Sequence, residues 1–190
     1  MELGIRVVGM EAARARLAEQ GRKVEPVLRG ALNTTAAKTR AERYVKPLSS
    51  TLKGARVRKA MKVKRANSKR SEARIIPSSS GVPIQYYKTW GYDPIDATHA
   101  RLWVRAPNGR KVAAGFVNPS SAQKLPWNTR SKKARQAGKN AWEHKRLALA
   151  PSVAYWFKAL SAPDTVRWVS AYLQQEFEKR IRRELAKGPR

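Results

Sequence analysis

Residues 53–70 read KGARVRKAMKVKRANSKR, and the rest of the chain is organised around this basic stretch. The sequence before it has the spacing of helices, and the sequence just after it has the character of strands. The stretch is therefore the joint between two halves of the chain. Most protein surfaces mix both signs of charge, so a run with no acidic residue predicts an anionic neighbour. Its basic residues are Lys53, Arg56, Arg58, Lys59, Lys62, Lys64, Arg65, Lys69 and Arg70.

The whole chain shares this excess of positive charge. Its 41 Lys and Arg outnumber 13 Asp and Glu, which gives a formal net charge of +28 over 190 residues. Self-repulsion at that charge opposes compaction, and a polyanion relieves it. We expect nucleic acid first and an anionic membrane surface second, although no apolar run approaches the ~20 residues of a membrane span. Cysteine is absent from the sequence, which excludes a disulfide framework and thiolate metal sites.

The first third of the chain predicts mainly helices. Alternation predicts a short strand before Gly9, and a stripe of residues three or four apart (Val24, Leu28, Leu32) predicts a strong helix that Pro47 ends. The predicted elements are a strand at 2–8, helices at 10–20, 24–45 and 49–66, and a polar turn at 67–71.

The middle of the chain predicts strands. Asn108-Gly109 between two β-like runs is the strongest short signal for a hairpin. In its first strand, Leu102 and Val104 share one face, and Trp103 and Arg105 share the other. The predicted elements are strands at 72–77 and 82–90, a hairpin at 100–117, a long basic arm at 118–138 and a final strand at 143–149.

The arm carries a second basic run beside Trp127. Aromatic rings next to cations can stack nucleic-acid bases, but Trp127 follows Pro126 and is better explained as an anchor for the loop. Long loops of this kind are uncommon in compact domains unless they bind something or are disordered. The basic residues of the arm are Arg130, Lys132, Lys133, Arg135 and Lys139.

The end of the chain predicts a short apolar helix at 152–160 and a long helix at 165–187. Residues 161–164 resemble a capping box, and one apolar stripe runs along the long helix through Leu173 and Phe177. We predict an α+β fold with an extended basic arm. The N-terminal helices and the long C-terminal helix pack on a small, mainly antiparallel sheet. We expect one domain with segments at 1–71, 72–150 and 151–190, made as a soluble protein in a cytoplasm.

Candidate catalytic residues are few. Asp93, Asp96 and His99 lie in DPIDATH, where a nuclease could hold Mg²⁺, but their spacing in a proline-containing loop favours turn chemistry. His144 is better explained as structural, and the serines of residues 78–81 as a plain linker. The other acidic residues are scattered and form no acid–base pair. We therefore expect a protein that is not an enzyme and holds no cofactor or metal.

The order of several short motifs resembles a known family. Each motif is weak alone, and their order and spacing over nearly the whole chain carry the resemblance. The motifs are Gly9-Met10-Glu11, ALNTTA at 31–36, VRKA at 57–60, VKRA at 63–66, ARI at 73–75, VPI at 82–84, GFV at 115–117, RLALAPS at 146–152, Phe157, and Glu176, Arg180, Arg183, Glu184 and Leu185 near the C-terminus. The chain resembles the minor tail protein Z family, the tail-completion proteins of long-tailed bacteriophages such as lambda.

The resemblance implies a structural virion protein at the head-proximal end of the tail. Such a protein would complete the tail and join it to the head as a ring or collar subunit, with a sixfold ring as the expected oligomer. The implied partners are other tail or connector proteins, including the tail terminator and the head–tail connector, with genomic DNA in the lumen and no membrane. The implied location is the virion tail, with assembly in the host cytoplasm.

Two rival classes remain open. The first is a free nucleic-acid-binding protein without sequence specificity, a hypothesis that rests on the charge alone. Such a protein would bind as a monomer in a salt-sensitive manner. A nuclease would depend on Asp93, Asp96 and His99 and would require Mg²⁺. In all three classes, the basic stretch contacts either nucleic acid or an acidic partner, or it is a solvated surface.

Overall fold

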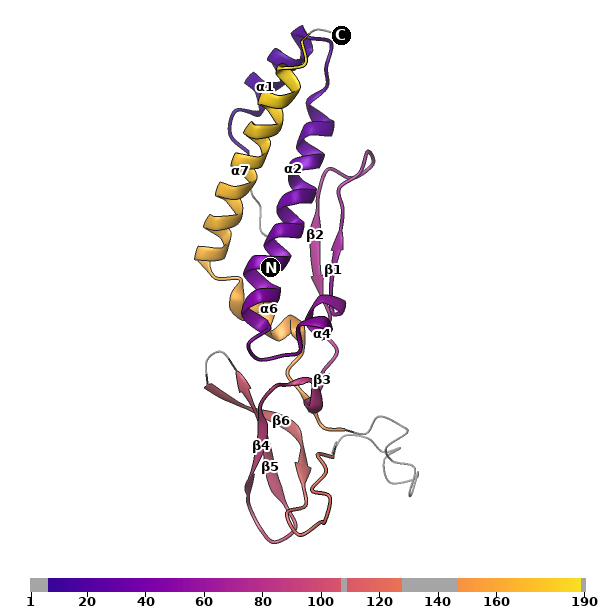
Figure 1. The fold of residues 1–190 in the computed structure, drawn as a ribbon, viewed down its shortest axis with the longest axis vertical. Helices are drawn as coiled ribbons and strands as arrows, with labels where there is room; N and C mark the ends of the chain where they lie inside the picture. The colour runs from indigo at the N-terminus through magenta and orange to yellow at the C-terminus, as the bar shows by residue number, and fades with distance from the viewer. Residues whose placement is uncertain (1–6, 107–108, 128–146, 189–190) are drawn as a thin grey trace. The chain divides into compact units, whose positions relative to one another are not determined.

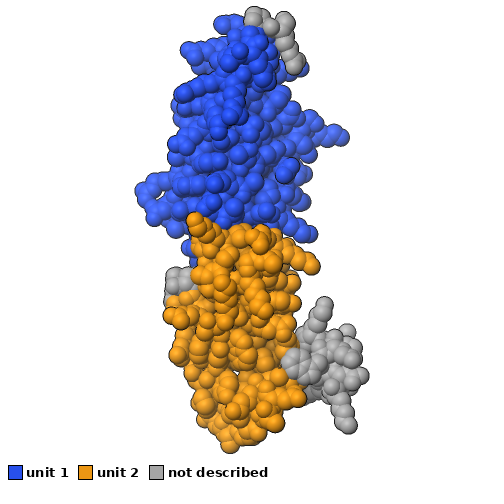
Figure 2. Space-filling view, viewed as in Figure 1, with its two compact units in different colours: residues 1–44, 61–76, 158–190 blue, residues 45–60, 77–157 orange. Residues whose placement is uncertain are grey.

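The computed structural model describes residues 7–106, 109–127 and 147–188 (Figure 1). It confirms the α+β class, with a long C-terminal helix and antiparallel sheets. The chain divides into two compact units (Figure 2): unit 1 holds residues 1–44, 61–76 and 158–190, and unit 2 holds residues 45–60 and 77–157. These boundaries differ from the three expected segments, because each unit is assembled from pieces distant in sequence. That the chain forms a single domain stays a prediction.

Unit 1 is built on three helices, α1 (Met10–Glu19), α2 (Val24–Thr39) and α7 (Pro163–Leu185). Helices α2 and α7 lie side by side (Figure 1). Their apolar stripes enclose a core that includes Leu17, Val24, Ala31, Leu173 and Phe177. All three helices were expected from their spacing, and the stripe on α7 is confirmed at its two most buried positions, Leu173 and Phe177.

A glycine on α2 gives α7 a close contact. A Cβ at Gly30 would lie 2.5 Å from Nη1 of Arg180, so only a glycine leaves room for the guanidinium there without a shift. Nη2 of Arg180 donates a hydrogen bond to Oγ1 of Thr34 at 2.8 Å. The weakly apolar face of α2 is therefore a surface for close helix packing.

The expected end of the second helix at Pro47 is wrong. Helix α2 passes into a π-helix, η1 (Arg40–Val45), and then into α3 (Lys46–Leu48). Pro47 is the second residue of α3, directly after the π-helix, so the helical backbone continues through the proline.

The expected capping box of α7 is also wrong. The helix begins after Ala162, and no side chain caps it. The Ser161 hydroxyl is instead hydrogen-bonded to the Tyr44 hydroxyl at 3.0 Å. That contact takes up the side chain that the capping box required.

The expected helix at 49–66 is wrong as well. The structure has a short helix α4 (Gly54–Lys59) followed by strand β1 (Met61–Lys64), which pairs with β2 (Arg74–Pro77) in a two-stranded sheet. Buried Met61 and half-buried Val63 alternate with exposed Lys62 and Lys64, a period-2 pattern. The predicted strand at 72–77 and the turn at 67–71 are confirmed.

Unit 2 is built on a five-stranded antiparallel sheet. The predicted hairpin is confirmed, with Ala106 paired to Gly109 and with Leu102 and Val104 fully buried on one face. The expected strand at 82–90 is interrupted by a 3₁₀ turn, η2 (Ile84–Tyr86). The strands run in the order β3 (Val82–Pro83), β7 (Leu149–Ala150), β6 (Gly109–Val117), β5 (Ala100–Ala106) and β4 (Trp90–Pro94).

Two hydrogen bonds in unit 2 run through the buried side chains of Trp156 and Tyr87. Trp156, on the expected helix α6 (Val153–Leu160), donates through Nε1 to the Tyr87 hydroxyl at 2.8 Å. That hydroxyl donates to the carbonyl oxygen of Pro151 at 2.7 Å. Burial raises the pKa of Tyr87 to about 12, so the phenol stays a donor.

Parts of four predictions lie outside the described residues. These are the strand at 2–8 except Val7 and Val8, residues 107–108 of the hairpin, the arm beyond Trp127, and the strand at 143–149 before Leu147. Within the described part of the arm, Trp127 forms antiparallel bridges with Phe116 and Leu147. This fits the prediction that Trp127 anchors the loop.

Candidate anion-binding surface

The basic stretch, residues 53–70, falls into two halves that belong to different units. Helix α4 carries Lys53, at its N-cap, through Lys59 and lies in unit 2, whereas β1 and the following turn lie in unit 1. The stretch is therefore not one helical face. Each half has its own support within its unit.

The first half is supported by a buried valine. Val57 is completely buried, and the backbone N–H of Lys53 donates to the carbonyl oxygen of Tyr86 at 3.0 Å. Arg56 is half-buried, with its guanidinium 5.0 Å from the centre of the Tyr86 ring, a cation–π contact. Lys53, Arg58 and Lys59 are exposed.

The second half is fixed to α2 by one asparagine. Oδ1 of Asn33 accepts from the backbone N–H of Ala66 at 2.7 Å, and its Nδ2 donates to the carbonyl oxygen of Ala66 at 3.1 Å. The side chain thus acts as a neighbouring strand would. Sequence reasoning missed this role, although Asn33 lies in one of the motifs of the resemblance, because nothing in the local spacing indicates a partner so distant in sequence.

A tight turn ends the stretch. Asn67 and Arg70 exchange backbone hydrogen bonds at 2.9 and 3.2 Å, and Oδ1 of Asn67 accepts from the N–H of Lys69 at 3.0 Å. Arg70 lies 3.8 Å from the Glu72 carboxylate. The turn therefore presents its cations on a fixed backbone.

Most of the basic stretch has no carboxylate partner. In the part of the chain that the structure describes, no ion pair forms at Lys53, Arg58, Lys59, Lys62, Lys64, Arg65 or Lys69, and all of these residues are exposed. Such cations are fully hydrated and available to an external anion. This is the feature expected of a phosphate-binding surface.

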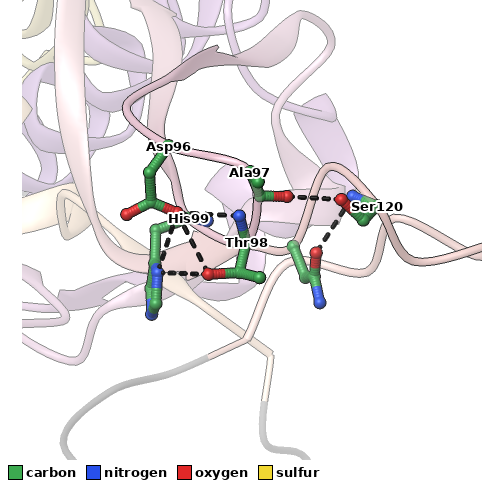
Figure 3. Close-up of polar contacts among 6 residues, drawn as sticks. Asp96, Ala97, Thr98, His99 and Ser120 are labelled. Atoms are coloured by element: carbon green, nitrogen blue, oxygen red, sulfur yellow. Dashed lines mark hydrogen bonds and ion pairs between the residues drawn. The ribbon is translucent and has the colours of Figure 1, made fainter.

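The structure confirms turn chemistry for Asp96. Its Oδ1 accepts from the backbone N–H groups of Thr98 and His99, both at 2.7 Å, and lies 3.1 Å from Nδ1 of His99 (Figure 3). The Thr98 N–H bond is the largest cause that lowers the pKa of Asp96 to about 2. Ser120 ties this loop to the next one through the carbonyl oxygen of Ala97 (Figure 3).

Asp93, the third member of the hypothetical metal set, is occupied elsewhere. Its Oδ1 accepts from Nε1 of Trp103 at 3.1 Å and lies 3.7 Å from Arg110, whose guanidinium covers the Trp103 ring at 4.2 Å. Among the described residues, no three His, Asp or Glu side chains are arranged to hold a metal ion.

The other candidates divide between described and undescribed residues. Ser78 joins two elements of unit 2, since its N–H donates to Ala60 at 2.7 Å and its carbonyl oxygen accepts from Ala154 at 3.0 Å. His144 and the basic run of the arm, Arg130, Lys132, Lys133, Arg135 and Lys139, lie outside the described residues.

No known protein family, curated protein or solved structure matches this chain. Over the described residues, no helix is both long and apolar enough to cross a membrane.

Proposed function

We propose that the chain is a structural subunit of a phage tail that acts at the head-proximal end, in tail completion and head–tail joining. It would form a ring or collar, with a sixfold ring as the expected symmetry, in contact with the tail terminator or the head–tail connector. The order of short motifs that resembles the tail-completion family is the observation that carries this proposal. The observed α+β class and long C-terminal helix are consistent with it.

The positive charge of the basic stretch would give this subunit a surface for an anionic neighbour. Exposed cations without carboxylate partners along the basic stretch suit a position beside genomic DNA or an acidic neighbouring ring. A second candidate, a free nucleic-acid-binding protein, is favoured by these unpaired cations alone. The two candidates differ in whether the chain has a fixed place in a particle.

Antibody-gold labelling of nuclease-treated particles from the phage lysate separates the two candidates. A tail subunit places gold at the head–tail junction. Particles without label, with the protein left in the soluble fraction, would contradict the proposal and favour the free nucleic-acid binder.

Charge reversal tests whether the surface serves in assembly. The variant R58E/K59E/K62E/R65E is expected to keep its fold and to block head joining or DNA positioning. A matched variant, K88E/R101E/R105E/K158E, changes the same amount of charge at other exposed residues. Normal infectious particles from the first variant, or equal defects in both, would contradict a role for the basic stretch.

A further inference from the structure

Unit 1 holds a cleft of about 530 Å³ beside the turn that ends the basic stretch. One wall is the end of α1 and the first turns of α2, with Arg14, Lys23 and Arg29. The other wall is the turn between β1 and β2, with the side chains of Asn67, Ser68 and Ser71. We call it the α2 cleft.

The walls of the α2 cleft are held at a fixed distance. The two hydrogen bonds from Asn33 to Ala66 join the hairpin to α2 next to the turn, and Ala66 is buried. The paired backbone bonds of Asn67 and Arg70 hold the turn itself. These bonds hold the backbone of the turn in place before a ligand binds, which lowers the entropy cost of binding.

The cleft has an excess of positive charge. Glu25 is its one carboxylate among the described lining residues, and it lies 3.5 Å from Arg14. Arg22 is committed to the fold, since it binds Glu184 at 2.7 Å and the carbonyl oxygen of Gly188 at 3.1 Å. Within the described ranges, Lys23 and Arg29 have no such partner. Two cations therefore remain for a ligand.

Polar residues accompany these cations. Asn67, Ser68 and Ser71 line the cleft, and each serine hydroxyl can donate to an anion. Lys23 is the N-cap of α2, and no side chain accepts from the first turn of that helix. In the first turn, Val24 and Glu25 keep a backbone N–H and Pro26 has none, so the helix start adds fewer donors than a turn without proline.

We propose that the α2 cleft binds phosphate groups of a nucleic-acid backbone. Arginine and hydroxyl donors suit phosphate oxygens, and the lining carries more cations than carboxylates. Exposed Lys69 and Arg70 on the same turn extend the positive surface beyond the cleft, as a chain of successive phosphates requires. The proposal is independent of whether the chain is a tail subunit.

The test is the affinity of the purified full chain for a fluorescent mixed-sequence DNA duplex, measured by anisotropy at several salt concentrations. The variant K23Q/R29Q removes two phosphate contacts. It is expected to weaken binding about fivefold or more at moderate salt, and to reduce the slope of log affinity against log salt by about 2. The control K88Q/K158Q loses the same charge at two exposed lysines outside the cleft. It is expected to keep nearly the wild-type slope.

A second variant guards against misfolding. Ser68→Asp places a carboxylate on the exposed turn without touching a buried group, and it is expected to weaken binding as well. Equal affinities and slopes for K23Q/R29Q and K88Q/K158Q would overturn the proposal. So would the absence of DNA binding by the wild type, or poly-glutamate that competes as strongly as DNA, which would make the cleft an acidic-peptide site.

Discussion

Helix α7 and the basic stretch are both rich in arginine and lysine, but they differ in how many of these cations have a carboxylate partner. Along α7, cations meet carboxylates three or four residues away: Arg180 lies 3.5 Å and Lys179 3.8 Å from Glu176, and Arg182 lies 3.7 Å from Glu178. The basic stretch has no acidic residue in its sequence, and most of its cations lack an ion pair in the described structure. Helix α7 is thus largely self-neutralised, whereas the basic stretch is a surface of unpaired positive charge.

The spacing of acidic residues therefore decides whether the positive charge is available to a partner. Exposed helical ion pairs contribute only about 0.3–0.5 kcal/mol each to stability. Their main effect on α7 is therefore to cancel its field rather than to hold it in place.

The largest expected effect is on stability, and it shows whether the apolar stripe or the ion pairs of α7 stabilise the helix. Phe177 is 2% exposed, and Phe177→Ala is expected to lower the free energy of unfolding by about 3–5 kcal/mol, because it leaves a cavity in the core of unit 1. Arg182→Gln on the exposed face should change it by less than about 0.5 kcal/mol. Urea unfolding followed by circular dichroism measures both. Equal losses would mean that the ion pairs hold α7.

The next effect is on the salt dependence of DNA binding, compared between the basic stretch and α7. Two variants lose four positive charges each, R58Q/K59Q/K62Q/R65Q in the basic stretch and R167Q/K179Q/R182Q/K187Q on or next to α7. We expect the first variant to reduce the slope of log affinity against log salt for a DNA duplex by about 3 to 4. Each unpaired cation that contacts a phosphate releases counterions from the DNA.

The second variant is expected to change the slope little, because carboxylates accompany its cations. Fluorescence anisotropy between 50 and 200 mM salt measures both slopes. Equal slopes for the two variants would mean that the cations of the basic stretch are no more available to DNA than the paired cations of α7.

A smaller effect concerns what fixes the basic stretch. Asn33→Ala removes both hydrogen bonds to Ala66 and leaves a buried backbone N–H and C=O unpaired, which should cost about 1–3 kcal/mol of stability. Hydrogen exchange of the Ala66 amide should become faster. Asn33→Asp keeps the acceptor but places a carboxylate oxygen against the carbonyl oxygen of Ala66, so it should also destabilise the fold. Unchanged exchange in the alanine variant would contradict the role of Asn33.

The smallest effect concerns the titration of Asp96, whose carboxylate is hydrogen-bonded within its own turn. Its pKa in the folded state is about 2, against an ordinary value of 3.8, because backbone N–H groups stabilise the carboxylate. A lowered pKa stabilises the fold fully above pH 4, and the contribution disappears as pH falls toward 2. Carboxyl carbon NMR shifts should show a midpoint near pH 2. A midpoint near the ordinary value would contradict the hydrogen-bonded turn.

The helices of unit 1 and the hairpin of unit 2 could be predicted because their signals are local. The stripe through Leu173 and Phe177 repeats every four residues, and Asn108-Gly109 marks the hairpin directly. The division into two units could not be predicted, because each unit joins segments far apart in sequence.

The fold of the basic stretch was predicted wrongly for a physical reason. Lysine and arginine have high helix propensity, and a strand of four residues, Met61–Lys64, is too short for its alternation to stand out. Its pairing with β2 and the clamp from Asn33 decide its structure. The candidate residues were nevertheless identified from charge alone, because the absence of neighbouring acids is visible in the sequence.

Lysine acetylation followed by mass spectrometry, compared between the free chain and purified phage particles, shows whether an anionic partner covers the basic stretch. Lys59, Lys62 and Lys64 should react slowly in particles and rapidly in the free chain, because an anionic neighbour covers them. Lys179 and Lys187 of the α7 region, paired within the chain, should react more evenly in the two states. Equal reactivity of the basic stretch in both states, or absence of the chain from particles, would contradict the account.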